Sequence, residues 1–238
     1  MRRNQYYFTF KLFPTLATLL LLPILMGLGF WQLHRAYLKH YLAADYEARS
    51  HLKPLSMIPT KVNPTLQFYP VLLKGKYDNK HQFLLDNRIY HHQVGYEVLT
   101  PLQLTDYHIL ILVNRGWIPQ GESRHSLPIL KPITGLQFIR GRLKIPSQKE
   151  LVLNKMEENP GQWPRVVQKI DLSSLKDALG KPLSPYIVLL APKTPNGFIR
   201  EWKLTTLSPT QHIAYAIQWF TFALLLLVIY IVVNVRKK

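Results

Sequence analysis

Two long apolar segments dominate the hydropathy pattern of the chain, and a polar, proline-rich middle separates them. The first extends from Leu12 to Trp31, with only Thr15 and Thr18 as polar interruptions, and the second extends from Ile213 to Val233. About 20 apolar residues in helical conformation span the hydrocarbon core of a bilayer. Both segments are therefore predicted to be transmembrane helices.

The pattern changes to a period of two from Val71 onward, which is typical of β-strands. We predict that strands 71–77 and 81–88 form a hairpin, with the residues between them as its turn. One short helix is predicted from Ser173 to Gly180. The first apolar helix is expected to continue through Tyr37–Ser50, and prolines make 54–70 an extended connector. Further strands are predicted at 95–102, 108–117, 138–143 and 186–190.

The predicted fold class is a membrane protein in which two transmembrane α-helices flank an exported α+β domain, mainly antiparallel β and resembling a small barrel. The predicted segments are a cytoplasmic N-terminus (1–11), transmembrane helix 1 (12–33), a helical extension with a proline-rich connector (34–70), a β-rich periplasmic domain (71–210), transmembrane helix 2 (211–233) and a cytoplasmic C-terminus (234–238).

Charge sets the expected orientation. The formal net charge is +17, and short basic segments flank both spans. Both termini are therefore expected in the cytoplasm. The spans are expected in the inner membrane of a Gram-negative bacterium, with the middle of the chain in the periplasm. The remaining basic charge favours a solvated surface that faces lipid headgroups over nucleic-acid binding, because no compact Lys/Arg block is present. The cytoplasmic segments are too short for an output module, which disfavours a sensor.

The first apolar segment also has features of a secretory signal peptide, because Arg2, Arg3 and Lys11 precede it. It is nearly a full bilayer long and lacks a small-x-small cleavage site at its end, so an uncleaved anchor is expected. The chain contains no cysteine, which excludes disulfides, thiolate metal sites and a catalytic cysteine. No nucleophile elbow, P-loop or dinucleotide fingerprint is present, and we expect no enzymatic activity.

A histidine opens the second span. At helical spacing His212, Tyr215, Ala216, Trp219 and Ala223 fall along one stripe, which suits a flat hydrophobic ring or simply another helix. An imidazole at the start of a membrane helix either faces headgroups or finds a partner inside the protein, and neutral imidazole is a common axial ligand for haem iron.

At the end of the first span Gly27, Trp31, His34 and Arg35 align on one side of the helix. Trp31 fits an interfacial aromatic belt, and Arg35 can extend to lipid headgroups. The alternative is that Trp31 and Arg35 contact something held between the two helices.

Five stretches stand out along the chain, namely Leu28–Arg35 with Lys39, Gly75–Tyr77, Gly95–Leu102, Asn114–Pro119 and His212–Phe220. In this order, from residue 28 to residue 220, they together resemble the SURF1 (Surfeit locus protein 1) family of cytochrome oxidase assembly factors.

The resemblance implies an integral membrane protein that binds haem a and helps to insert it into subunit I of cytochrome c oxidase, with haem a synthase as a further expected partner. The family's histidine at the start of the second span corresponds to His212, which is then the axial ligand of the haem iron. Tyr215 and Trp219 match the same motif and are expected to flank the ring. Trp31 and Arg35 match the first motif, and our hypothesis is that Arg35 pairs with a haem propionate.

Two rival functions remain open at this stage. The first is an assembly chaperone that contacts subunit I without a cofactor, and the second is a periplasmic sensor or small-molecule binding module. The sequence also leaves open whether haem a or haem b is preferred and which residue is the second axial ligand.

Overall fold

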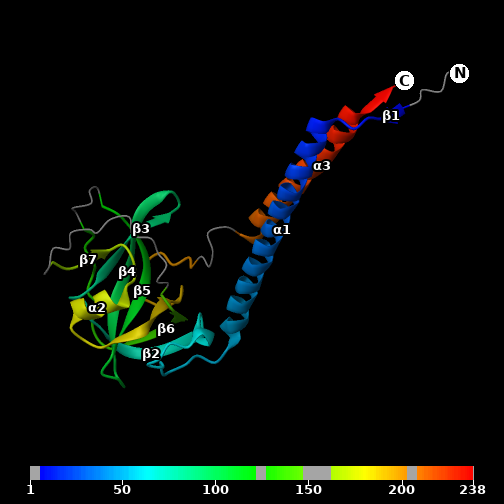
Figure 1. Cartoon of the computed structure of the whole chain (residues 1–238). Coiled ribbons are helices and arrows are strands. Elements are labelled where there is room, and N and C mark those ends of the chain that lie inside the picture. The colour runs from blue at the N-terminus through cyan, green and yellow to red at the C-terminus, as the bar shows by residue number, and fades with distance from the viewer. Residues whose placement is uncertain (1–5, 122–126, 147–161, 203–207, 238) are drawn as a thin grey trace. The chain divides into compact units, whose positions relative to one another are not determined.

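The computed structural model describes residues 6–121, 127–146, 162–202 and 208–237 (Figure 1). The chain divides into two compact units. One comprises Met1–Asp45 with Lys203–Lys238, and the other comprises Tyr46–Trp202.

The first unit is a hairpin of two long helices, α1 (Leu12–Ala48) and α3 (Pro209–Asn234). Both are long and apolar enough to cross a membrane. They lie side by side in Figure 1, and contacts pair early α1 residues with late α3 residues, so the helices are antiparallel. The predicted extension of the first helix is confirmed, since α1 continues to Ala48 and a 3₁₀ turn follows at Arg49–His51.

A short two-stranded sheet joins the ends of this hairpin. Strand β1 (Tyr6–Phe8) pairs antiparallel with β9 (Val235–Lys237). Beside it, the fully buried Asn234 accepts a hydrogen bond at its side-chain oxygen from the Lys11 N–H at 2.8 Å and one at its carbonyl oxygen from the Thr9 N–H at 2.7 Å. The sequence analysis missed these strands because three residues are too few to establish a period.

The second unit is a β-barrel. Its strand order is β2-β6-β8-β5-β4-β3-β7, and an additional pairing of β2 with β4 closes five of the strands into a barrel. Most pairs are antiparallel, whereas β5–β8 and β3–β7 are parallel. The predicted fold class is confirmed. The strands are β2 (Pro70–Tyr77), β3 (Phe83–Tyr90), β4 (Gln93–Leu104), β5 (Leu110–Pro119), β6 (Gln137–Lys144), β7 (Arg165–Val167) and β8 (Leu183–Leu190).

Apolar side chains from alternate strand positions form the barrel interior, as the period of two requires. A second cluster lies outside the sheet, where Leu175 of α2 (Leu172–Leu179) packs on Ile187 and Leu189 of β8. The predicted short helix is confirmed, and it ends at Gly180 in the left-handed conformation (φ 60°). The interior cluster includes Val71, Leu73, Leu102, Ile111, Val113, Ile139, Leu143, Val188 and Leu190.

The predicted hairpin of strands 71–77 and 81–88 is wrong. Both β2 and β3 run antiparallel to β4 along the same edge, with β2 beside Leu102–Leu104 and β3 beside Gln93–Leu99. The chain therefore does not reverse direction between them. The Asn79 amide both donates to and accepts from the backbone of Ile133, at 2.9 and 2.8 Å, and this fixes a break between two collinear strands.

Candidate functional site

Small residues are buried along the two long helices. Thr18, Gly29 and Ala36 of α1 and Ala216 and Ala223 of α3 are buried. A Cβ atom built at Gly29 would lie 2.5 Å from the Phe220 ring, so that ring occupies the space which the glycine leaves open.

His212 lies in this interface, with a side chain turned toward α1. His212 is 6% exposed, and its Nδ1 atom lies 2.8 Å from the side-chain oxygen of Gln32. A carbonyl oxygen only accepts hydrogen bonds, so Nδ1 carries the proton and donates it. This arrangement leaves Nε2 as the ring nitrogen through which a neutral imidazole would ligate a metal.

The N-terminus of α3 fixes the position of His212. Ser208 is the N-cap residue, and its hydroxyl accepts a hydrogen bond from the Gln211 N–H at 3.3 Å. The Gln211 side chain accepts in turn from the Ser208 N–H at 2.8 Å, which completes a capping box, and Pro209 occupies the first helical position. His212 therefore follows a well-defined helix start and occupies the fourth helical position.

The other four predicted site residues are not buried between the helices. Trp31 is 52% exposed and Tyr215 is 47% exposed, while Arg35 is exposed and Trp219 is half-buried. Arg35 lies with its guanidinium carbon 5.9 Å from the centre of the Trp31 ring. Trp219 packs edge-on against Phe222 at 6.0 Å. The stripe of α3 residues predicted from the sequence therefore divides into a buried part, which includes His212, and an outward-facing part, which includes Tyr215.

Helical geometry places the outward-facing residues on one flank of the hairpin. Successive residues of a helix are 100° apart, so in an antiparallel pair the residues that directly precede contact positions face the same side on both helices. The contact positions are Gln32 and Ala36 on α1, and Ala216, Phe220 and Ala223 on α3. The residues that precede them are Trp31, Arg35, Tyr215, Trp219 and Phe222, which we call the aromatic flank.

Gln32 is the site residue that sequence reasoning missed, although it belongs to a stretch on which the family resemblance rests. A polar residue near the end of an apolar segment was a usable signal. The antiparallel alignment of the two spans was needed to place it opposite His212, and one helix alone gives no such pairing.

The stretch Asn114–Pro119 of β5 connects the barrel to neighbouring segments by hydrogen bonds. The N–H of Trp117 donates to the carbonyl of Ile199 at 2.7 Å, and its indole donates to the carbonyl of Arg88 at 2.8 Å. Gly116 has φ 108°, and a Cβ atom there would lie 2.5 Å from the Ile199 carbonyl oxygen. These contacts give the stretch a structural role.

Arg115, from the same stretch, is a buried cation whose described hydrogen-bond partners are neutral. It donates to the Asn196 carbonyl at 2.8 Å and to the side-chain oxygens of Gln82 and Thr100, each at 3.3 Å. Burial lowers the pKa of its guanidinium, and burial raises the pKa of the neighbouring Tyr77 hydroxyl to about 12.

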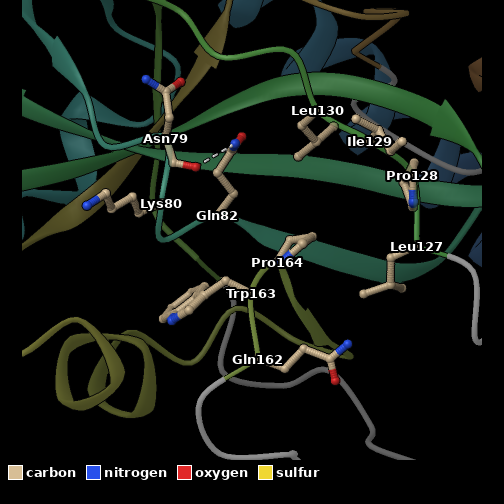
Figure 2. A pocket seen from close by; sticks show the side chains of 10 residues that line it. All are labelled: Asn79, Lys80, Gln82, Leu127, Pro128, Ile129, Leu130, Gln162, Trp163 and Pro164. Carbon is tan, nitrogen blue, oxygen red and sulfur yellow. Dashed lines mark hydrogen bonds between the residues drawn. The ribbon is translucent and has the colours of Figure 1, made fainter.

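A cavity of about 430 Å³ opens near this network (Figure 2). Gln82 lies at its wall, where its side-chain nitrogen donates to the carbonyl of Asn79 at 3.1 Å. Its other described lining residues include Leu127–Leu130, Trp163, Pro164 and the basic Lys80 (Figure 2). None of the five predicted site residues contributes to this cavity.

Comparisons with known proteins indicate one family over most of the chain. Residues 19–224 match the model of the SURF1 family. A SURF1-like protein of Monosiga brevicollis is 24% identical over 92% of this chain and 87% of its own length. A SURF1-like protein of Rickettsia prowazekii is 29% identical over 88% and 84%, and the human Surfeit locus protein 1 is 24% identical over 85% and 71%.

Proposed function

The chain belongs to the SURF1 family, and from this premise we propose that it binds haem a and aids its insertion into subunit I of a haem-copper cytochrome c oxidase. Membership of this family supports a role as a cytochrome oxidase assembly factor, and not as a catalyst. Haem a is then a cargo, which supplies redox chemistry to the oxidase and not to this chain.

The hydrogen bond between His212 and Gln32 is the observation that carries the proposal. It holds the imidazole in one orientation through Nδ1 and leaves Nε2 as the nitrogen for a metal. Residues that bond the second nitrogen of a ligating histidine fix the tautomer and raise its basicity. The ring is only 6% exposed, so iron reaches Nε2 only after neighbouring side chains move aside.

The aromatic flank supplies the remaining contacts. Gly29 and Phe220 are too close to admit a porphyrin between the helices at their level. We therefore place the ring against the flank, where Trp31, Tyr215 and Trp219 offer apolar surface. Arg35 beside Trp31 is available for a charge-assisted hydrogen bond to a propionate.

We further propose that the protein resides in the inner membrane with both termini in the cytoplasm and the barrel domain in the periplasm. The two apolar helices and the basic residues that flank them support this orientation. The proposed partners are subunit I of cytochrome c oxidase, haem a synthase and the lipid bilayer, and we propose no nucleic-acid partner.

Complementation of a deletion strain tests the function. The strain receives the wild-type gene, the His212→Ala gene or the His34→Ala gene, where His34 is an exposed histidine of α1 and serves as the matched control. The haem a content of the purified oxidase is measured in each. We expect wild type and His34→Ala to restore it and His212→Ala to leave it several-fold lower at equal protein levels.

The close contact of Gly29 with Phe220 favours one alternative, an assembly chaperone that carries no cofactor. This function is supported if His212→Ala restores full oxidase haem while deletion lowers it. Normal oxidase activity in the deletion strain would instead support the function of a periplasmic binding module.

A further inference from the structure

One outer face of the barrel is covered less than the others among the described residues, although Tyr46 contacts Arg142 of β6 there. Helix α2 and neighbouring segments pack over β8, β5, β4 and β3. On β2 from Leu72 onward and on β6, by contrast, every second side chain points outward and is exposed or half-buried. Leu72 is 48% exposed and Phe138 is 64% exposed, which is high for large apolar side chains of a barrel.

This β2–β6 face is basic. The outward positions include Lys74 and Lys76 on β2 and Arg140 and Lys144 on β6. Neither strand carries an Asp or Glu residue. The register sets cations opposite apolar side chains, with Leu72 opposite Arg140 and Lys74 opposite Phe138.

A recess of about 510 Å³ lies at the end of this face. Lys76, His108 and Lys181 supply basic groups to its wall, while Gln103, Thr105 and Tyr107 supply polar ones. No acidic residue lines it. Three elements meet there, namely the end of β2, the turn between β4 and β5, and the loop that precedes β8.

Hydrogen bonds hold the walls of the recess in place. The Gln103 side chain donates to the Tyr107 carbonyl at 3.0 Å, which fixes the turn. Thr105 donates from its N–H and its hydroxyl to the Lys74 carbonyl, at 3.1 and 2.9 Å. The recess is therefore preformed, as small-molecule sites usually are.

From these observations we infer that the recess lined by Lys76, His108 and Lys181 binds the phosphate group of an anionic ligand. Lysine ammonium groups are compact cations that bind phosphate as point charges, and no carboxylate lines the recess itself, the nearest in sequence being the exposed Asp106 of the same turn. The cations of the β2–β6 face extend the attraction beyond the recess.

The phosphate can come from a lipid headgroup or from a soluble compound. Leu72 and Phe138 lie on the adjoining face and would add apolar contacts only for a lipid. A chain with two candidate spans also keeps its barrel domain near phospholipid. The inference does not depend on the proposed haem function.

A ³¹P NMR titration of the full chain in a phosphate-free maltoside detergent tests the inference. The probes are inorganic pyrophosphate, short-chain phosphatidylglycerol and short-chain phosphatidylcholine. The test variant combines Lys76→Gln with Lys181→Gln. The control variant combines Lys53→Gln with Lys193→Gln, which removes the same charge from exposed lysines that do not line the recess.

We expect wild type and control to bind an anionic probe and the test variant to bind it at least tenfold more weakly. Tighter binding of phosphatidylglycerol than of pyrophosphate and phosphatidylcholine identifies a lipid source, and the reverse preference identifies a soluble one. Equal binding by the test and control variants, or no binding by wild type, would overturn the inference. Circular dichroism of both variants confirms that each is folded.

Discussion

At the residue scale, the pairing of Gln32 with His212 is the feature with the greatest consequence. The sequence alone singled out His212, because an imidazole at the start of an apolar helix is unusual. It could not show which nitrogen carries the proton, since that depends on a residue 180 positions away in the sequence. The structure assigns the proton to Nδ1 through the Gln32 carbonyl oxygen.

A Gln32→Leu substitution removes this acceptor and frees the imidazole to adopt either tautomer. We expect haem affinity to fall by roughly 10–100-fold, the range found when partners of ligating histidines are lost. Titration of the purified chain with haem, followed by absorbance, measures the change. Gln218→Leu, at an exposed position of α3, is the control and should bind as wild type does. Equal affinities for the two variants would show that Gln32 does not position the ligand.

Asp171 offers a second test at this scale. Its carboxylate caps α2 and accepts hydrogen bonds from Ser173 and Ser174. The hydroxyl of Ser173 is the main cause that lowers the pKa of this carboxyl. A lowered folded-state pKa contributes stability that is present above the ordinary carboxyl range and is lost as the pH falls through the folded value.

We therefore expect Asp171→Ala to destabilise α2 by about 1 kcal/mol at neutral pH, the usual cost of losing an N-cap. Hydrogen exchange of the α2 amides in the wild type and the variant measures the difference, with the unfolded exchange rate corrected for pH. The two proteins should converge in acid. A difference that persists unchanged to low pH would argue against the capping role of the carboxylate.

At the scale of elements, the packing of α1 on α3 depends on one glycine. Gly29→Ala would place a methyl group 2.5 Å from the Phe220 ring, so the helices must separate or the ring must move. We expect a loss of about 1–3 kcal/mol in hairpin stability, typical of overpacking. Gly27→Ala is the matched control, because nothing lies within 4 Å of its added Cβ atom. Unfolding in mixed detergent micelles compares the variants, and equal midpoints would refute the contact.

The barrel contains a comparable position at Gly116. Its φ of 108° is unfavourable for any side chain, and an added Cβ would also meet the Ile199 carbonyl. Backbone strain alone costs about 1–3 kcal/mol, so Gly116→Ala should lower the melting temperature of the barrel unit clearly. Gly135→Ala, at φ 75° in open space, should lower it less. A smaller effect at Gly116 than at Gly135 would contradict the assigned packing.

Element positions were more predictable than their pairings. The strands predicted at 95–102, 138–143 and 186–190 lie within observed strands, and the strand predicted at 108–117 corresponds to β5, which begins two residues later at Leu110, because alternation is a local property. The partner of a strand is not local. The residues after Tyr77 have turn chemistry, yet they form a break between collinear strands, since β4 is long enough to pair with β2 and β3 in succession.

At the scale of the whole molecule, α1 is longer than a bilayer requires. Its 37 residues extend about 55 Å, against about 30 Å of hydrocarbon. The apolar part ends near Trp31, and the remaining turns continue as the same helix to Ala48. Hydropathy predicted the extent of the apolar part. The sequence predicted a small barrel as the fold class, but not which strands close it. That closure depends on the pairing of β2 with β4, which are distant in the sequence.

The most direct measurement is the haem content of the full chain after purification in detergent from cells that make haem a. Pyridine haemochrome spectra are recorded for wild type, His212→Ala and the exposed control His34→Ala at equal protein concentration. We expect haem a in the wild type and in His34→Ala, and at least a tenfold loss in His212→Ala. Haem retained at the wild-type level in His212→Ala, or absent from the wild type, would contradict this expectation.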